Sequence, residues 1–148
     1  MRQKKNNKGF SLVELIVVIA IMIVLVAVLA PVFTKYVEQS RRATDVQNAN
    51  TIAEAILVEA ADSNLATTAV KKVTTTEIKA IKEVPKVKGD AVSGAKGTDG
   101  FYYEYNKDTN TVKIYIGTDA DKTESGDLTT EENTNAYKTA DAGSLATQ

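Results

Sequence analysis

The chain has 148 residues and a formal net charge of -1, and it contains neither cysteine nor histidine. These absences exclude disulfides, thiolate or imidazole metal sites and the usual nucleophile-base pairs of enzymes. We therefore predict a protein that is not an enzyme, with no catalytic residues, no metal and no cofactor.

Residues 1–9 form a short basic segment ahead of a long apolar run. They carry Arg2, Lys4, Lys5 and Lys8 and no acidic residue. Positive charges beside an apolar segment stay on the cytoplasmic side of a membrane, so we expect the N-terminus to lie inside. Without this segment the formal charge changes from -1 to about -5, and that balance disfavours specific binding of nucleic acid.

Residues 10–33 are apolar almost throughout. A helix of this length reaches roughly 36 Å and crosses a hydrocarbon core of about 30 Å, which predicts a membrane-spanning stage. One carboxylate, Glu14, lies near the start of the run. A carboxylate costs roughly 2.5 to 3.5 kcal/mol at a bilayer centre even on the gentler scales, so Glu14 predicts a partner for its charge.

Two plainer interpretations of this run fit less well. A secretory signal peptide has an apolar core of about 7 to 15 residues, whereas this run is longer and is interrupted by Glu14. Its best cleavage pattern, Val28-Leu29-Ala30, would also place Pro31 directly after the cut. A plain single-pass anchor leaves the cost of Glu14 unexplained.

The boundary between the basic segment and the apolar run reads Lys8-Gly9-Phe10-Ser11-Leu12-Val13-Glu14-Leu15. It resembles the class III signal of type IV pilins and pseudopilins, and the resemblance covers residues 1–50. In that family a membrane prepilin peptidase cuts after the glycine and usually methylates the new N-terminal residue. The resemblance therefore implies a processing site at Gly9 and Phe10, with the modified amine on Phe10.

The same resemblance implies a partner for Glu14, because this glutamate in the family's filaments is thought to meet the N-terminal amine of a neighbouring subunit. Phe10 and Glu14 lie about 6 Å apart along a helix axis, so an axial shift of that size brings amine and carboxylate together. Leaving one partner of a buried ion pair uncompensated is costly, so the contact would set the register of assembly. A bond from Glu14 to the amine of its own chain is an open alternative.

Pro31 lies inside the expected helix, where it removes the hydrogen bond to the carbonyl of Ala27. Many pilins have proline at this spacing and lose helical order just before it in the filament, so the resemblance implies a role for Pro31 in assembly. Ile23–Ala30 lacks the glycine that many relatives have there, which leaves the extent of melting open. In an unassembled subunit we expect a continuous, bent helix.

Beyond Pro31 apolar residues recur at helical spacing between charged ones, which predicts an amphipathic continuation over residues 34–62. The recurring positions are Phe33, Val37, Val46, Ala49, Ala53, Ile56, Leu57 and Ala60. Asp62-Ser63-Asn64 favours a turn, so one helix should run from about Phe10 to near Ala61. Arg41 and Arg42 are expected on its solvated face.

Residues 63–117 are expected to form a small globular head. Thr74-Thr75-Thr76-Glu77 resembles a capping box and predicts a short helix that ends at Val84-Pro85. A connecting loop follows, marked by Gly89, Gly94, Gly97 and Gly100, and its spacing matches no phosphate-binding motif.

The strongest strand signals are Phe101–Tyr105 and Val112–Ile116, which flank a turn-rich segment and predict a β-hairpin. Val112, Ile114 and Ile116 should cover the helix while the alternate residues face solvent. Residues 118–148 are mostly polar, and we expect them to add an edge strand around residues 135–139, to wrap the hairpin or to stay flexible.

The predicted fold is α+β: a long N-terminal α-helix, membrane-spanning in its first half and amphipathic in its second, packed on a small antiparallel β-sheet head. The resemblance implies a structural subunit of a type IV pilus, a self-assembling helical homopolymer for adhesion, motility or DNA uptake. It implies prepilin peptidase, an assembly platform and motor, and membrane lipid before assembly as partners, with no specific nucleic acid. The precursor would lie in the cytoplasmic membrane and the filament outside the cell.

Three other functions fit the sequence to different degrees. A pseudopilin of a type II secretion or competence machine shares the same N-terminal features and is the closest alternative. A ligand-binding module on a permanent stalk would keep residues 1–9 and use the tyrosine-rich hairpin. A conductive fibre is disfavoured because aromatic residues make up 6% of the chain and are concentrated in the expected head.

Overall fold

The structure is a computed structural model that describes residues 10–63, 65–93, 99–118 and 125–147. The chain divides into two compact units, Met1–Tyr36 and Val37–Gln148, and each is described by itself. The fold is α+β, with one long helix, a three-stranded antiparallel sheet and a short second helix.

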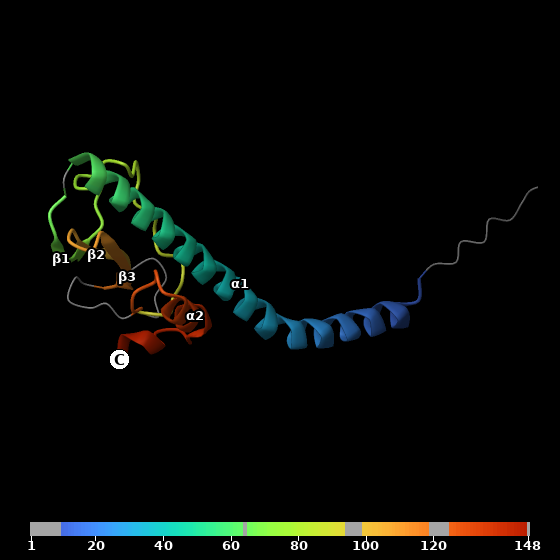
Figure 1. Ribbon diagram of the computed structural model, residues 1–148. Coiled ribbons are helices and arrows are strands. Elements are labelled where there is room, and N and C mark those ends of the chain that lie inside the picture. Colours follow the sequence, from blue (N-terminus) through green and yellow to red (C-terminus); the bar gives the residue numbers. More distant parts are fainter. Residues whose placement is uncertain (1–9, 64, 94–98, 119–124, 148) are drawn as a thin grey trace, which may run out of the picture. The chain divides into compact units, whose positions relative to one another are not determined.

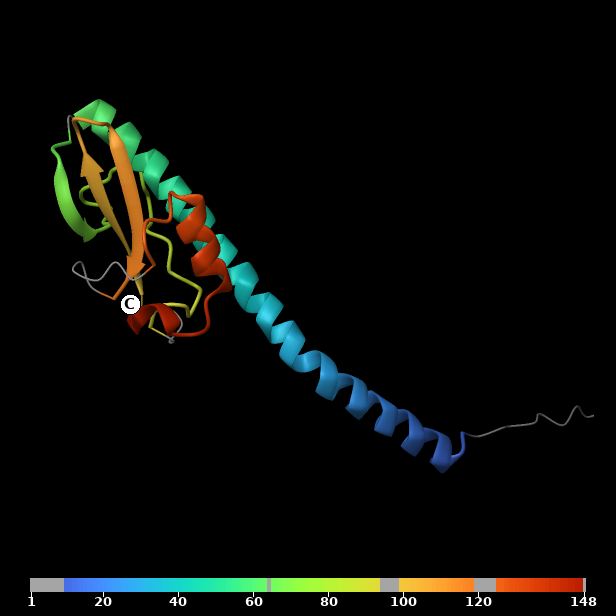
Figure 2. The ribbon, with the colours of Figure 1, turned by 60° about the horizontal axis from the view of Figure 1, so that its bottom comes forward.

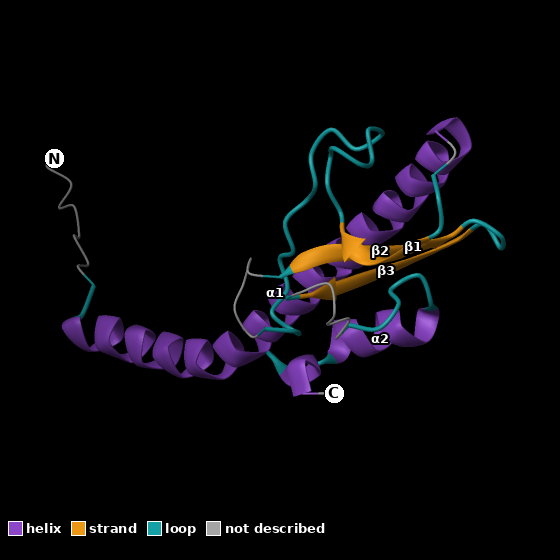
Figure 3. Cartoon of the chain, turned by 90° about the vertical axis from the view of Figure 1, so that its left-hand side faces the viewer, coloured by secondary structure: helices purple, strands orange, loops and turns teal. Residues whose placement is uncertain are grey.

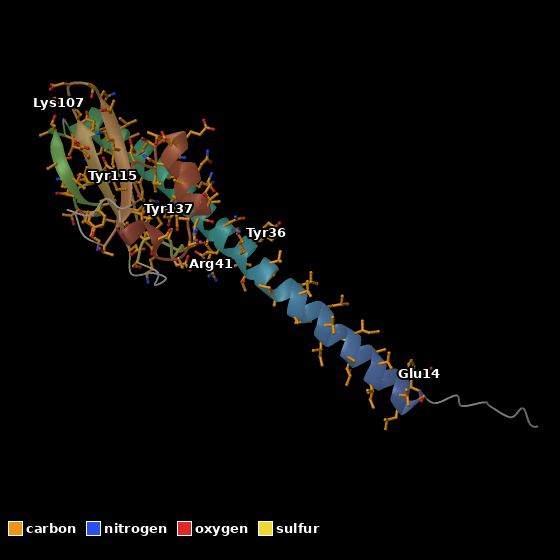
Figure 4. All side chains as sticks on the ribbon, turned by 90° about the horizontal axis from the view of Figure 1, so that it is seen from below. Glu14, Tyr36, Arg41, Lys107, Tyr115 and Tyr137 are labelled. Carbon is orange, nitrogen blue, oxygen red and sulfur yellow. The ribbon has the colours of Figure 1, made fainter. Side chains whose placement is uncertain are left out.

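Helix α1 spans Leu12–Ser63, so its ends lie within two residues of the predicted ones. Every residue from 10 to 36 is exposed, and the side chains of this half project all round the helix axis (Figure 4). Within the described residues, α1 is the helix long and apolar enough to cross a membrane. It continues through Pro31, as we expected for an unassembled subunit.

In the second unit, one face of α1 packs on the sheet (Figure 1). The strands are β1, Thr68–Lys72, β2, Gly100–Asn106, and β3, Thr111–Gly117, in the order β1-β2-β3 with both pairs antiparallel. The predicted hairpin is therefore confirmed, with Tyr103 opposite Ile114 in the register. Strand β1 was not predicted, because Thr68-Ala-Val-Lys-Lys has little apolar alternation and is a strand through its pairing with β2.

The core lies between α1 and one face of the sheet. Its buried members are Val46, Ala49, Ile52, Ile56, Val73, Ile78, Val87, Ala91, Val92, Phe101, Tyr103, Tyr105, Ile114, Ile116, Leu128, Tyr137 and Leu145. Ile114 and Ile116 are buried as predicted, and the aromatic side chains at alternate positions of β2 lie on the same face. These tyrosines therefore serve packing.

The predicted short helix after Thr74 does not form. Residues 75–77 and 79–80 are turns, held by a bond from the Ile78 N–H to the Thr74 carbonyl at 3.1 Å. The Glu77 carboxylate, expected to bond back to Thr74, instead accepts from Lys71 Nζ at 2.8 Å and the Tyr103 hydroxyl at 3.3 Å. Donors on β1 and β2 thus bind the Glu77 carboxylate, which a capping box would need for its own backbone N–H.

Residues 135–139, for which an edge strand was considered, belong instead to helix α2, Glu131–Thr139. Two acidic residues in its first turn and a lysine in its last turn suit the helix dipole, and Tyr137 is its buried anchor. Figure 2 shows α2 beside the second half of α1. A short 3-10 helix, Ser144–Thr147, follows (Figure 3), and Gly94 and Gly97 lie outside the described residues.

Candidate processing and assembly site

The first turn of α1 holds the residues expected to matter for processing and assembly. Gly9 lies outside the described residues, and Phe10, two residues before the helix, is 86% exposed. Ser11 is the residue before the helix, and Glu14 is in its first turn. The proposed cut would make Phe10, two residues before the first helical residue, the new N-terminus.

Glu14 bonds to its own helix terminus. Its Oε2 accepts the Ser11 N–H at 2.9 Å, and the Ser11 Oγ accepts the Val13 N–H at 3.4 Å. A Ser three residues before a Glu, with both side chains satisfying end groups of the backbone, is a capping box. The pattern was present in the sequence as Ser11-Leu12-Val13-Glu14, and our sequence analysis missed it because it considered only the charge of Glu14.

This bond gives Glu14 a partner within its own chain before cleavage. In the uncut chain the Phe10 nitrogen is a peptide nitrogen, so neither amine considered above exists yet. A carboxylate in the first turn also lies at the positive end of the helix dipole, which favours its charge. Among the described residues Oε1 accepts no hydrogen bond, so one oxygen of Glu14 is left for a further donor.

Pro31 is not part of this first-turn site. It lies 17 positions after Glu14, or roughly 25 Å along the helix axis. Pro31 and its neighbours are exposed, and its carbonyl accepts the Thr34 hydroxyl at 3.0 Å. Phe10, which follows Gly9, thus lies close to Glu14 at the start of α1, whereas Pro31 lies far from both.

The second unit contains a buried polar cluster that sequence reasoning missed. Asp45 on α1 is 0% exposed; its Oδ1 accepts the Lys88 N–H at 2.8 Å. Its Oδ2 accepts the Gly89 N–H at 2.7 Å and the Tyr137 hydroxyl at 3.0 Å. Asp45 therefore joins three segments of the chain: α1, the loop before β2, and α2.

Burial sets the electrostatics of this cluster. Desolvation raises the pKa of Asp45, while the bonds from Lys88, Gly89 and Tyr137 oppose that shift. Burial, and secondarily the neighbouring Asp45 charge, raises the pKa of the Tyr137 hydroxyl above its usual range. The Tyr137 phenol therefore stays protonated at neutral pH and can donate its hydrogen bond to Asp45.

Arg42 was expected on a solvated face, and this expectation is wrong. The side chain is 4% exposed; it donates to Asp90 at 2.8 Å and to the carbonyl of Ala140, and pairs with Glu38 at 3.5 Å. The helical spacing in the sequence places Arg42 next to other charged residues. It does not reveal that the loop before β2 and the end of α2 cover the side chain. Arg41 is partly exposed and pairs with Glu38 at 3.4 Å.

The arrangement of the described residues suits packing and assembly. Within them there is no group of three or more carboxylates placed to hold a metal ion. Asp45 and Arg42 have their polar atoms directed at backbone and side chains of the same unit, where they fasten the loop and α2 to α1. The first turn of α1, in contrast, presents a carboxylate beside exposed backbone.

Comparison with protein-family models matches residues 4–30 to the prokaryotic N-terminal methylation motif. No curated protein and no solved structure matched the chain. The matched residues include Gly9, Phe10 and Glu14 and most of the exposed apolar half of α1. Together the signal and the apolar helix fit a membrane-anchored precursor, and they suggest a structural protein. The chain thus carries a prepilin-type N-terminal methylation motif, the class III signal of a type IV pilin-like precursor.

Proposed function

We propose that the chain is the structural subunit of a type IV pilus. Prepilin peptidase removes residues 1–9, and the mature chain polymerises through the apolar half of α1 into a surface filament for adhesion, motility or DNA uptake. The observation that carries this proposal is the methylation motif, which continues directly into a helix whose apolar side chains are exposed on all sides. An apolar surface of this kind needs lipid or other helices around it.

The proposal gives each segment one task. Residues 1–9 hold the precursor's N-terminus in the cytoplasm, and residues 10–33 cross the membrane and later form the filament core. Residues 34–62 continue the helix into the head, residues 63–117 form that head, and residues 118–148 complete its surface. The assembly platform and motor then move the subunit from the membrane into the filament, which lies outside the cell.

The capping bond of Glu14 supports a specific order of events. Before cleavage, Glu14 is satisfied by the Ser11 N–H at 2.9 Å. Cleavage creates a charged amine at Phe10, one residue before that N–H, so Glu14 is already held near the end that changes. One carboxylate oxygen can keep the cap while the other accepts the amine of a neighbouring subunit, which would set the axial register.

Pro31 would act later, in the filament. A residue without an N–H weakens the helix at that point, which allows the chain to adjust as apolar helices pack together. In the unassembled subunit the continuous helix through Pro31 is compatible with that role.

The first test is mass spectrometry of protein sheared from the cell surface, together with electron microscopy of cells that lack the chain. We expect a mature N-terminus at Phe10 with one added methyl group, and loss of long fibres in the deletion strain. Retained fibres with blocked secretion would favour a pseudopilin of a secretion or competence machine. A chain that starts at Met1 or Pro31 would overturn both functions.

A further inference from the structure

The loop that follows β1 carries an excess of positive charge. Between residues 71 and 88 the sequence has six lysines and two glutamates, whereas residues 118–148 have seven acidic residues and two lysines. The net charge of the whole chain, -1, conceals this segregation. We define the basic loop as residues 79–88, whose exposed charged residues are the lysines Lys79, Lys82, Lys86 and Lys88 and one acid, Glu83.

The sequence of the basic loop alternates apolar anchors with lysines. Ile78 and Val87 are buried in the core, and Ile81 and Val84 are partly buried against it. The apolar anchors face the core, so the lysines between them are exposed. These lysine side chains therefore lie on the outside of the head.

The basic loop is fastened at both ends. The Lys79 N–H donates to the Glu59 carboxylate at 3.0 Å, and the Lys88 N–H donates to Asp45 at 2.8 Å. Glu59 and Asp45 both belong to α1, so the loop runs along that helix. A set of charges on a backbone held in this way loses little conformational entropy when it binds a partner.

The side-chain ammonium groups of Lys79, Lys82 and Lys86 form no ion pair or hydrogen bond with other described residues, whose ion pairs use other basic side chains. The acidic residues Glu131, Glu132 and Asp141 are also exposed and form no ion pair with described residues. Two of them lie in the first turn of α2. We call Glu131 and Glu132 the acidic patch, since Asp141 follows the opposite end of α2. One subunit thus carries two unpaired surfaces of opposite charge.

We propose that the basic loop of one subunit docks on the acidic patch of a second copy of this chain. A contact between two different surfaces is head-to-tail, and such a contact repeats from subunit to subunit into a ring or, where the rotation does not close, into an open helical filament. Charge complementarity of this kind fixes register and partner choice more than affinity. The inference rests on the proposed function, since it assigns a contact within the filament.

Other anionic partners of the basic loop fit the chain less well. A nucleic acid would have to approach a mature chain whose formal charge is about -5, a balance that opposes binding to phosphates. The acidic patch would then also have no counterpart. A second copy satisfies both surfaces at once.

The test exchanges the charges. Lys82→Glu with Lys86→Glu should reduce sheared fibres by about tenfold, because the loop then repels the acidic patch. Glu131→Lys with Glu132→Lys should have a similar effect, and a chain with all four substitutions should recover most of the fibres. The control, Lys72→Glu with Lys107→Glu, makes the same charge change at exposed positions on β1 and after β2 and should leave fibres intact (Figure 4 labels Lys107).

Each variant is also checked for cleavage after Gly9 by mass spectrometry, so that lost assembly is not mistaken for lost processing. If the unmodified chain forms no fibres, the proposed function fails and this contact with it. If it forms fibres and both reversed pairs do so equally well, only the contact is overturned. A loop variant that loses fibres and is not rescued by the acidic reversals overturns the second copy as partner and indicates another anion, nucleic acid or lipid.

The chain offers a second test, because it contains no cysteine. A chain with both Lys82→Cys and Glu132→Cys, treated in fibres with a short bifunctional thiol crosslinker, should give a ladder of covalent multimers. Either substitution alone should give no species larger than a dimer. Monomers and dimers alone from the doubly substituted chain would overturn the contact.

Discussion

Two carboxylates on α1, Glu14 and Asp45, show how differently the two halves of this helix are supported. Glu14 accepts one hydrogen bond, from the N–H of Ser11 in its own first turn. Asp45 accepts three, all from segments more than 40 residues away in the sequence, and is fully buried. The second unit therefore supplies its own partners, whereas the first has only local bonds.

The apolar residues show the same contrast. Val46, Ala49, Ile52 and Ile56 lie on one face and are buried by the sheet and α2. From residue 10 to 36 no face is covered, and the side chains there are almost all apolar. A half-helix of this kind is stable only where lipid or other helices surround it. The contacts within one chain therefore explain the fold of the head. The N-terminal half of α1 can be explained only together with the lipid or the other helices around it.

The largest expected effect comes from Glu14→Ala. We expect cleavage after Gly9 to continue and the head to stay folded, while sheared fibres fall by about tenfold or more, because an uncompensated amine is costly to bury. Quantitative immunoblots of the sheared fraction, with mass spectrometry of the N-terminus, measure both steps. Normal fibres from this variant would remove our account of the carboxylate.

Glu14→Gln separates the two roles of this side chain. Glutamine can still bond back to the Ser11 N–H in a capping box but carries no charge. If charge between subunits sets the register, Glu14→Gln should fail in assembly as Glu14→Ala does. If Glu14→Gln assembles normally, the cap is what matters.

Asp45→Ala tests the other half of the comparison. It leaves two buried donors, the Gly89 N–H and the Tyr137 hydroxyl, and the partly buried Lys88 N–H without an acceptor, so we expect the free energy of unfolding of the head to fall by about 3 kcal/mol or more. Urea unfolding of the full chain in detergent can be followed by tyrosine fluorescence, since five of the six tyrosines lie beyond Tyr36.

A conservative substitution at the same position refines this test. Asp45→Asn keeps one acceptor oxygen, so it should be less harmful than Asp45→Ala. If the head of the Asp45→Ala variant is as stable as that of the unmodified chain, the loop and α2 do not depend on this carboxylate.

Much of the fold could be predicted from local patterns. The helix bounds followed from apolar periodicity, and the hairpin followed from two β-rich runs around a turn. Strand β1 and helix α2 were missed because their sequences, Thr68–Lys72 and Glu131–Thr139, are mostly polar and take their structure from β2 and from the burial of Tyr137. Local propensity is too weak to decide such segments.

The candidate site shows the same limit. Ser11-Leu12-Val13-Glu14 and Thr74-Thr75-Thr76-Glu77 have the same capping pattern, yet only the first caps a helix. At Glu14 a long apolar run without glycine or proline follows as far as Ala30, whereas Glu77 is followed by Pro85 and has Lys71 and Tyr103 within reach. The pattern is local, but the competing partners come from strands that the sequence does not place nearby.

Gly89→Ala should disturb the second unit by less than the loss of Asp45. A Cβ at Gly89 would lie 2.8 Å from Arg42 Cγ and from the Tyr137 hydroxyl, and 3.0 Å from Asp45 Oδ2. We expect a loss of about 1 to 3 kcal/mol, because a packed cluster cannot admit the methyl group without shifting.

Gly100→Ala is the matched control for crowding in the same urea experiment. Its Cβ would meet Lys72 Cε at 3.2 Å, near the end of a flexible side chain that can move. The head should therefore keep most of its stability. If both alanines prove equally harmless, the cluster around Asp45 is looser than these distances indicate.

The smallest expected effect concerns the cap itself. Ser11→Ala removes the Oγ that accepts the Val13 N–H at 3.4 Å but leaves the backbone N–H that Glu14 binds. Loss of an N-cap side chain costs about 1 kcal/mol, so amide hydrogen exchange in the first turn should quicken by roughly fivefold in detergent, with exchange around Asp45 unchanged. Thr51→Ala removes a mid-helix hydroxyl bonded to the Gln47 carbonyl and should not quicken exchange, since alanine favours the helix interior. Unchanged exchange with Ser11→Ala would mean that the first turn is held by something other than the Ser11 hydroxyl, such as the bond from the Ser11 N–H to Glu14.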